Sequence, residues 1–175
     1  MILCECNSVL VMHRMICAER CGNMQQCTLL FVVKDGDVLL GMKKKGFGKG
    51  KWNGFGGKLN YGEEIHEAAV RETWEECMIR VREMVKHAEL TFLFPVKPEW
   101  DQTVHVFVSR KWEGTPTETE EMMPKWFDIK ELPLDRMWAD NVHWLPKVLA
   151  GERLRAKFIF RADNETIEDV KLRDY

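Results

Sequence analysis

The chain has 175 residues, of which 45 % are apolar and 31 % are charged, and these proportions predict one globular, soluble domain with an adequate core. Its 26 basic and 28 acidic residues give a net charge of −2, which leaves no strong positive field for binding nucleic acid or an anionic membrane. The six cysteines show neither metal-ligand nor disulfide spacing, and no apolar run is long enough to cross a bilayer, so we expect a reduced, intracellular and monomeric protein.

The first segment, residues 1–26, mixes acidic and basic residues around a mildly apolar centre, which does not match a secretory signal. Chain ends are commonly poorly ordered, so we expect a peripheral N-terminal extension here. One folded domain is expected to occupy residues 27–175, without internal repeats or low-complexity stretches.

The domain is expected to begin with a β-hairpin, because apolar runs at 27–33 and 38–43 flank an Asp-Gly pair. The glycines of the basic stretch at 43–57 predict a loop or short irregular strand, and residues 64–77 predict a helix. The later segments predict strands at 84–94, 103–112 and 125–129, a short helix at 141–151, and a hairpin at 155–161 and 166–172. Because strands and helices do not alternate regularly, the expected fold class is α+β.

The predicted helix at 64–77 has an acidic side. At about 100° per residue, it places Glu72, Glu75 and Glu76 on one side, and the opposite side, which is expected to pack, carries Val70, Thr73, Trp74 and Cys77. Like charges at this spacing repel by about 0.2–0.5 kcal/mol per pair. One interpretation is a solvated face. The other is a site for a hard divalent cation such as Mg²⁺, which the glycine-rich loop favours because its backbone can approach a ligand closely.

The stretch from Gly57 to Ile79 is similar to the Nudix box, Gly-x5-Glu-x7-Arg-Glu-apolar-x-Glu-Glu-x-Gly-apolar. The leading glycine and the five fixed polar positions occur at the required spacing, as Gly57, Glu63, Arg71, Glu72, Glu75 and Glu76. Two positions depart from it. Thr73 replaces an apolar residue, although its methyl group can still pack, and Met78 replaces a glycine. If that position needs a positive φ, methionine costs about 1–2 kcal/mol there.

From Thr28 to Tyr175 the chain resembles the animal MutT-homologue branch of the Nudix family, which hydrolyses oxidised purine nucleoside triphosphates, through "LLGMKKKGFGKGKWNGFGGK", "VHVF", "EEMMPKWF" and "MWAD". The resemblance implies an α/β/α sandwich around a mixed β-sheet, with the Nudix loop and helix and a second helix in the C-terminal half. It implies Mg²⁺ as cofactor, with Mn²⁺ as a substitute, and hydrolysis of a small-molecule nucleoside triphosphate such as 8-oxo-dGTP to the monophosphate and pyrophosphate. Further candidate substrates are 2-oxo-dATP and methylated purine triphosphates. The expected location is the cytoplasm, with mitochondrial or nuclear nucleotide pools as alternatives.

The resemblance also implies roles for single residues. The metal ligands would be one backbone carbonyl and four carboxylates: Gly57, Glu72, Glu75, Glu76 and Glu121. One glutamate could also be the general base, for which Glu76 or Glu75 is favoured and Glu121 is a third candidate. Arg71 would complete the catalytic set by orienting loop and glutamate side chains, Glu63 included. The alternative for Arg71 is a surface ion pair worth about 0–1 kcal/mol.

Purine recognition is implied for a second set of residues. Asn53, Asp140 and Asn141 would lie at the purine edge, Trp138 over the ring face, and Lys43 near the sugar or phosphates. Phe92 would lie below or beside the ring, and three aromatic side chains and one threonine would surround the pocket: Thr28, Phe47, Phe94 and Trp144. Core packing is the alternative for the aromatic residues, because most of the seven tryptophans and nine phenylalanines must lie in the core. Trp138 is the exception, because it lies in the polar, loop-like stretch "DRMWADN".

Asn141 is the departure that matters most for substrate choice, because the animal relatives carry a second aspartate there. Two aspartates can share a proton and switch their hydrogen-bonding pattern, whereas an amide offers one fixed acceptor and one fixed donor group. We therefore expect 8-oxo-dGTP to remain a substrate and selectivity toward 2-oxo-dATP to differ. Two other functions stay open, namely hydrolysis of another capped diphosphate, such as a dinucleoside polyphosphate or nucleotide sugar, and non-hydrolytic nucleotide binding.

Overall fold

The computed structural model describes residues 24–46 and 48–174, so the expectations for residues 1–23 and for Phe47 lie outside the described residues. Eight strands form one mixed sheet in the order β3-β2-β1-β5-β4-β7-β8, and β6 also pairs with β2. Two pairings are parallel, β1 with β5 and β4 with β7. The strand bounds are β1 Gln25–Lys34, β2 Asp37–Lys43, β3 Trp52–Asn53, β4 Arg80–Leu93, β5 Gln102–Glu113, β6 Met122–Asp128, β7 Leu154–Phe160 and β8 Ile167–Asp174.

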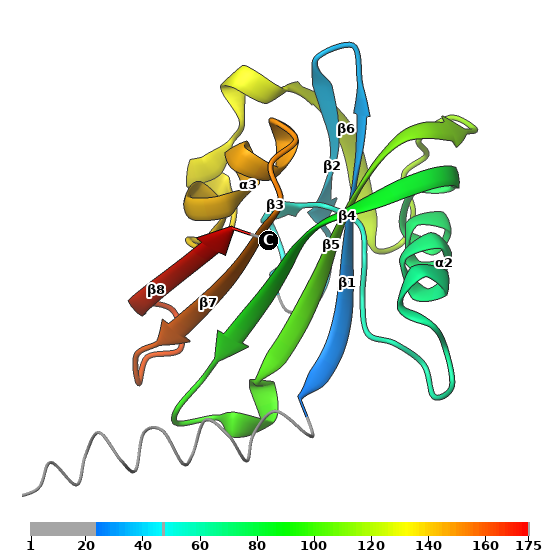
Figure 1. Cartoon of the computed structure of the whole chain (residues 1–175). Helices are drawn as coiled ribbons and strands as arrows, with labels where there is room; N and C mark the ends of the chain where they lie inside the picture. Colours follow the sequence, from blue (N-terminus) through cyan, green and yellow to red (C-terminus); the bar gives the residue numbers. More distant parts are fainter. Residues whose placement is uncertain (1–23, 47, 175) are drawn as a thin grey trace, which may run out of the picture.

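Two α-helices, α2 (Ile65–Cys77) and α3 (Asn141–Leu149), lie on opposite faces of this sheet (Figure 1). Successive residues of a strand point to opposite faces. Along β1, Leu30 therefore packs in the core under α2, whereas Phe31 packs in the core under α3. The result is an α/β/α sandwich, which confirms the expected fold class. Three single-turn 3₁₀ helices lie in the connections, at Pro98–Trp100, Ile129–Glu131 and Leu134–Arg136.

The turn between β1 and β2 confirms the predicted hairpin. Asp35 and Gly36 have φ angles of 52° and 92°, and two successive positive φ values are what a two-residue type I′ turn requires. The pairing runs from Val32 opposite Leu39 to Lys34 opposite Asp37. The turn therefore sets the register of β2, which leads directly into the glycine-rich loop.

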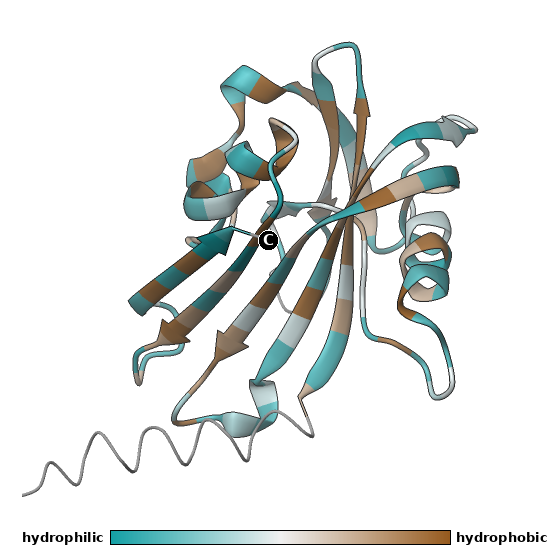
Figure 2. Cartoon of the chain, in the orientation of Figure 1, coloured by the Kyte–Doolittle hydropathy of each residue, from teal (hydrophilic) through white to brown (hydrophobic). Residues whose placement is uncertain are grey.

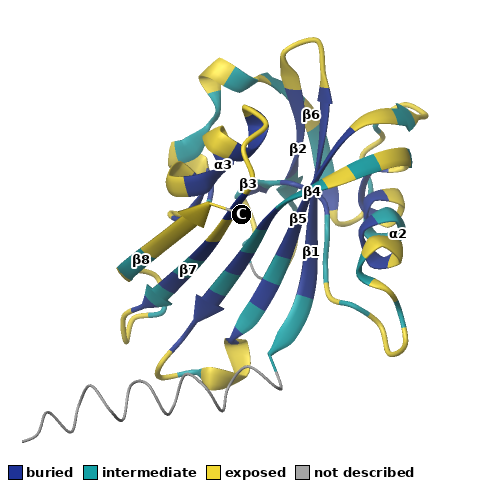
Figure 3. Cartoon of the chain, viewed as in Figure 1, coloured by how far each residue is buried: buried dark blue, intermediate teal, exposed yellow. Residues whose placement is uncertain are grey.

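Burial follows the middle of the sheet. Apolar and polar residues alternate along β7, whereas β1 carries an unbroken apolar run at 29–33 (Figure 2). Buried positions concentrate on β1, β2, β5, β4 and β7, and β8 at the sheet edge is largely exposed (Figure 3). The larger core lies under α3 and the smaller one under α2. No helix in residues 24–46 and 48–174 is long and apolar enough to cross a membrane.

Helix α2 buries a different side from the one that the sequence predicted. Thr73 and Cys77 are fully buried as expected, but Trp74 is 36 % exposed, and the guanidinium of Arg80 lies 4.9 Å from its ring centroid. Glu76 is instead only 3 % exposed. The interpretation of the acidic side as a solvated face therefore does not hold for Glu76, whose carboxylate points toward the sheet and the glycine-rich loop.

The end of α2 confirms that the position of Met78 needs a positive φ. Met78 adopts the left-handed conformation with φ 61° and ψ 23°, and its N–H donates to the carbonyl of Trp74 at 2.9 Å. Glycine is the usual residue at such a helix end because it has no Cβ. The methionine side chain is 39 % exposed, so little packing offsets the strain.

Candidate active site

Four glutamates from two parts of the chain line one cavity of about 500 Å³. Glu72, Glu75 and Glu76 come from α2, and Glu121 comes from the segment that leads into β6. The sequence predicted that these four carboxylates lie together, and the cavity shows that they do. Their side chains differ in exposure, from 4 % for Glu76 to 55 % for Glu75. The cavity thus has a buried carboxylate at its base and exposed ones at its mouth.

Groups from three segments fix Glu76, two at its carboxylate and one at its backbone carbonyl. Its Oε2 accepts a hydrogen bond of 2.9 Å from the backbone N–H of Gly56, and its Oε1 lies 3.3 Å from the ammonium of Lys43. The hydroxyl of Thr119 donates to its backbone carbonyl at 3.1 Å. Burial raises the pKa of Glu76 to about 7, although the Gly56 N–H and the Lys43 ammonium both act to lower it.

Arg71 ties the glutamates to the loop that precedes α2. Its guanidinium donates to both carboxylate oxygens of Glu63, at 2.7 and 2.9 Å, and to the carbonyl of Lys58 at 3.2 Å. It also donates to Glu72 at 2.8 Å and Glu75 at 3.1 Å. The hydrogen bonds from Arg71 hold the pKa of Glu63 at about 2. Because one planar fork serves three carboxylates, Arg71 is a positioning residue rather than one half of a surface pair.

The backbone at Gly57 passes close to Glu72. A Cβ placed on Gly57 would lie 2.5 Å from Oε1 of Glu72, so only glycine leaves this carboxylate in place. The Gly57 carbonyl accepts a hydrogen bond of 2.8 Å from the N–H of Thr28. A carbonyl oxygen has two lone pairs, so this bond still leaves one for a further partner.

The residues expected at the purine edge gather at the start of α3. Asp140 is buried, and this burial raises its pKa, although the indole N–H of Trp144, which donates to its Oδ2 at 2.8 Å, acts to lower it. The amide nitrogen of Asn141 donates to the carbonyl of Trp138 at 3.2 Å. The Oδ1 of Asn141 is buried and has no hydrogen-bond partner within the described residues. This unpaired acceptor is a contact available to a ligand.

The glycine-rich loop touches this second cluster as well. The ammonium of Lys51 lies 5.0 Å from the ring centroid of Trp138 and 3.4 Å from the carbonyl of Met137. A Cβ on Gly48 would lie 2.9 Å from the same indole ring. Trp138 therefore lies against the loop, in contact with the segment that follows Lys43.

The remaining residues expected around the purine are packed in the core or stand apart. The ring of Phe92 stacks on Phe158 with centroids 5.2 Å apart, and that of Phe94 stacks on Phe160 at 4.6 Å. Asn53 accepts a hydrogen bond from the N–H of Gly54. Neither Asn53 nor the buried Thr28 makes a hydrogen bond to the cluster around Asn141 in the described part of the chain. Both nonetheless flank the glycine-rich loop.

Comparison with known proteins identifies the family. The profile of the NUDIX domain matches residues 25–148, which is more than half of the chain. The chain belongs to the Nudix family. An oxidized purine nucleoside triphosphate hydrolase from Danio rerio is 45 % identical over 141 residues, covering 81 % of this chain and 90 % of the relative. The protein of the same name from Mus musculus is 42 % identical over 147 residues, covering 84 % and 93 %.

Solved structures agree with this assignment. A MutT mutator protein from Bacillus halodurans superimposes with a TM-score of 0.73 at 27 % identity, covering 85 % of this chain and 97 % of the other. A MutT Nudix hydrolase from Burkholderia pseudomallei has a TM-score of 0.62 at 23 % identity, which shows the fold alone; it covers 69 % of this chain and 95 % of its own. Helix α2 and the loop before it are accordingly the Nudix helix and loop.

Nudix hydrolases use a divalent metal ion, and the donor set of the cavity suits one. Carboxylate and carbonyl oxygens are the ligands of hard cations. Within residues 24–46 and 48–174, however, no group of three or more His, Cys, Asp or Glu side chains is already arranged to hold a metal. The reason lies in their partners, since Arg71 binds Glu72 and Glu75, and Lys43 binds Glu76 and Glu121. The oxygens fit a divalent cation chemically.

Sequence reasoning missed three groups in the Nudix site. These are the Gly56 N–H and the Thr119 hydroxyl, which fix Glu76, and Lys51, which lies over Trp138. Lys43 was expected near the sugar or phosphates, and the structure places its ammonium among the carboxylates. The run of lysines beside an acidic helix was the available signal, but a run of charge does not say which carboxylate each lysine meets.

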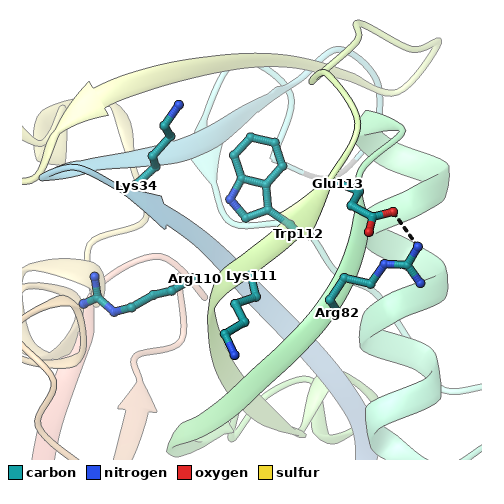
Figure 4. A pocket seen from close by; sticks show the side chains of 6 residues that line it. All are labelled: Lys34, Arg82, Arg110, Lys111, Trp112 and Glu113. Carbon is teal, nitrogen blue, oxygen red and sulfur yellow. Dashed lines mark hydrogen bonds and ion pairs between the residues drawn. The ribbon is translucent and has the colours of Figure 1, made fainter.

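A second cavity of about 530 Å³ lies away from the glutamates, at the ends of β4 and β5 (Figure 4). It is lined by four basic side chains, one indole and one carboxylate, namely Lys34, Arg82, Arg110, Lys111, Trp112 and Glu113. Arg82 is paired with Glu113, and Lys111 with Glu83 at 2.7 Å. The charged ends of Lys34, Arg110 and Lys111 point in different directions rather than toward a common centre (Figure 4). This surface therefore has the character of a solvated basic rim.

Proposed function

We propose that this chain is a Mg²⁺-dependent hydrolase of oxidised purine nucleoside triphosphates, which converts 8-oxo-dGTP to the monophosphate and pyrophosphate. The observation that carries the proposal is the cavity in which Glu72, Glu75, Glu76 and Glu121 meet. The names of the zebrafish and mouse relatives, at 45 % and 42 % identity, support the substrate class. Hydrolysis of 8-oxo-dGTP would keep an oxidised base out of the precursor pool for DNA.

The four carboxylates and the Gly57 carbonyl would hold the metal. A bound Mg²⁺ supplies charge neutralisation of the phosphates and a lower pKa for water. The chain itself supplies position, because Arg71 orients Glu72 and Glu75 while the Gly56 N–H orients Glu76. The proton of the attacking water would be accepted on a carboxylate oxygen of Glu76 or Glu75, with Glu121 as the third candidate.

The base would be recognised at the start of α3. The unpaired Oδ1 of Asn141 is an acceptor, and the second hydrogen of its amide is a donor, so this side chain can meet the edge of a purine. Asp140 beside it is buried against Trp144. The indole of Trp138 provides a flat surface for stacking, and Lys51 keeps that ring against the glycine-rich loop.

The test is pyrophosphate release in the presence of Mg²⁺ from 8-oxo-dGTP and from dGTP at equal, low concentration. We expect strong preference for 8-oxo-dGTP, and near-complete loss of hydrolysis in the variants Glu76→Gln and Glu121→Gln. Glu120→Gln is the matched control, because Glu120 is exposed and does not line the cavity, so its activity should equal that of the unmodified protein. Failure to cleave either nucleotide would reject the proposed reaction.

A further inference from the structure

Lys43 is placed between two carboxylates that come from different elements. Its Nζ lies 3.3 Å from Oε1 of Glu76 on α2 and 3.3 Å from Oε2 of Glu121 in the segment before β6. The Lys43 side chain is 28 % exposed, compared with 58 % for Lys45. A lysine ammonium is charged at neutral pH, so Lys43 neutralises part of the negative charge of these two carboxylates.

The carboxylates of Glu76 and Glu121 are also proposed metal ligands, so the ammonium of Lys43 and a divalent cation would compete for them. Mg²⁺ binds oxygen at about 2.0–2.1 Å, so a cation held by both carboxylates would lie close to the present position of the ammonium. Two positive charges that close repel each other in a partly buried cavity. Metal binding and the present position of the Lys43 ammonium are therefore expected to oppose each other.

Only the side chain of Lys43 needs to move. Its backbone is held on both sides, because its N–H donates to the carbonyl of Lys51 at 3.0 Å and its carbonyl accepts from the N–H of Gly50 at 2.8 Å. The four-carbon stem of lysine is flexible, so the ammonium can leave the carboxylates without unfolding the loop. Once displaced, it remains attached at the rim of the same cavity as a free cation.

We propose that Lys43 is an internal counter-ion of the Glu76 and Glu121 carboxylates, that a divalent cation displaces its ammonium, and that the displaced ammonium then becomes available to the phosphates of the substrate. The inference rests on the proposed function because it assumes that the glutamates bind metal. It adds that metal and substrate are coupled through one side chain. Without metal, the Lys43 ammonium stays on the carboxylates of Glu76 and Glu121. When metal binds, the ammonium becomes free to bind the phosphates of the substrate.

Binding of Mn²⁺ to the substrate-free protein tests the displacement, measured by calorimetry. Lys43→Met should bind Mn²⁺ about tenfold more tightly than the unmodified protein, because no ammonium competes for the two carboxylates. Lys45→Met is the matched control. This substitution also removes one positive charge beside Glu121, because the Lys45 ammonium lies 3.8 Å from Glu121. Lys45 makes no ion pair with Glu76, so the effect of Lys45→Met on Mn²⁺ affinity should be less than about twofold. Equal affinity in Lys43→Met and the unmodified protein would overturn the inference.

A second measurement follows the ammonium directly. Lysine acetylation by an acylating reagent, read by mass spectrometry, should be slow at Lys43 without metal and several-fold faster with Mg²⁺, while Lys44, which is paired with Glu118, keeps its rate. A Lys43 rate that does not respond to Mg²⁺ would contradict displacement. The proposed function fails separately: if neither the unmodified protein nor Lys43→Met binds Mn²⁺, the metal site itself is wrong, and this inference is wrong with it.

Discussion

Lys43 and Lys51 are joined by a backbone hydrogen bond of 3.0 Å, yet their ammonium groups end at different parts of the site. The Lys43 ammonium meets Glu76 and Glu121, whereas that of Lys51 lies over the ring of Trp138. The loop between β2 and β3 thus contacts both the carboxylate cavity and the cluster at the start of α3. A change in the backbone of this loop would therefore alter contacts both in the carboxylate cavity and at the start of α3.

Gly57→Ala should reduce hydrolysis strongly with little effect on stability. The added Cβ would lie 2.5 Å from Oε1 of Glu72, and a carboxylate at the end of a flexible side chain can move away at low cost in folding free energy. The moved carboxylate would no longer be where Arg71 and the metal need it. We expect kcat to fall by about tenfold or more, in line with the cost of small displacements in active sites, at an unchanged melting temperature. A fall in melting temperature that accompanies the fall in kcat would mean that Gly57 acts only through folding.

Glu76→Gln should stabilise the metal-free protein at high pH. The pKa of Glu76 is raised from 4.5 to about 7 in the folded state, so the folded protein binds more protons than the unfolded chain in this window. Stability contributed by this group is therefore lost as the pH rises from 4.5 to 7. Glutamine takes no charge and avoids that loss.

Thermal unfolding in EDTA measures this effect. At pH 8 the melting temperature of Glu76→Gln should exceed that of the unmodified protein by several degrees, because the substitution removes a cost of about 1–3 kcal/mol for burying the charged carboxylate. At pH 4.5 the two should converge. Glu75→Gln, whose side chain is 55 % exposed, is the control and should gain little at either pH. A lower melting temperature for Glu76→Gln at pH 8 would show that its contacts to Gly56 and Lys43 outweigh the cost of burial.

Met78→Gly should raise stability. Met78 has φ 61°, a conformation that costs a residue with a Cβ about 1–2 kcal/mol. Glycine removes this cost, but part of the gain is lost because glycine has greater entropy in the unfolded chain. The expected net gain is about 1 kcal/mol, or about 3 °C in melting temperature for a chain of this size. Met84→Gly, in the middle of β4, is the opposite control and should destabilise. No change in Met78→Gly would mean that its exposed side chain stabilises the fold as much as its backbone strains it.

Asn141→Asp should change substrate selectivity and leave the carboxylate cavity intact. The amide has one fixed acceptor and one donor group, whereas an aspartate next to the buried Asp140 could share a proton with it. We expect the ratio of kcat/KM for 2-oxo-dATP over 8-oxo-dGTP to rise by about tenfold, which corresponds to the usual free-energy cost of leaving one buried polar group unpaired. Val142→Thr, at an exposed position one residue further on, controls for general disturbance of α3. An unchanged ratio would show that Asn141 does not read the base.

The parts of this structure that could be predicted were those fixed by neighbours in sequence. The Asp35-Gly36 turn and the start and end of α2 depend on local backbone preferences, and each was predicted within a residue or two. The side of α2 that is buried depends on what packs against it. Glu76 can be buried because its carboxylate accepts a hydrogen bond from the N–H of Gly56 and pairs with the ammonium of Lys43. Neither contact can be deduced from helical periodicity.

The same limit explains the aromatic residues. Phe92 stacks on Phe158 because β4 and β7 pair in parallel, and that pairing joins strands separated by most of the C-terminal half of the chain. Such non-local pairings leave no signal in the pattern of a single strand. The acidic box, by contrast, was found because its members are close in sequence, and only Glu121 had to be brought from elsewhere.

The placement of α2 and α3 on opposite faces of one sheet has a consequence for how new specificities arise. Three of the four cavity glutamates belong to α2, and the proposed contacts to the base belong to the start of α3, so each set can accumulate mutations without repacking the core beneath the other. If residues 138–141 read the base as proposed, a lineage, or a protein engineer, can change the choice of nucleotide there and inherit the hydrolytic apparatus unchanged.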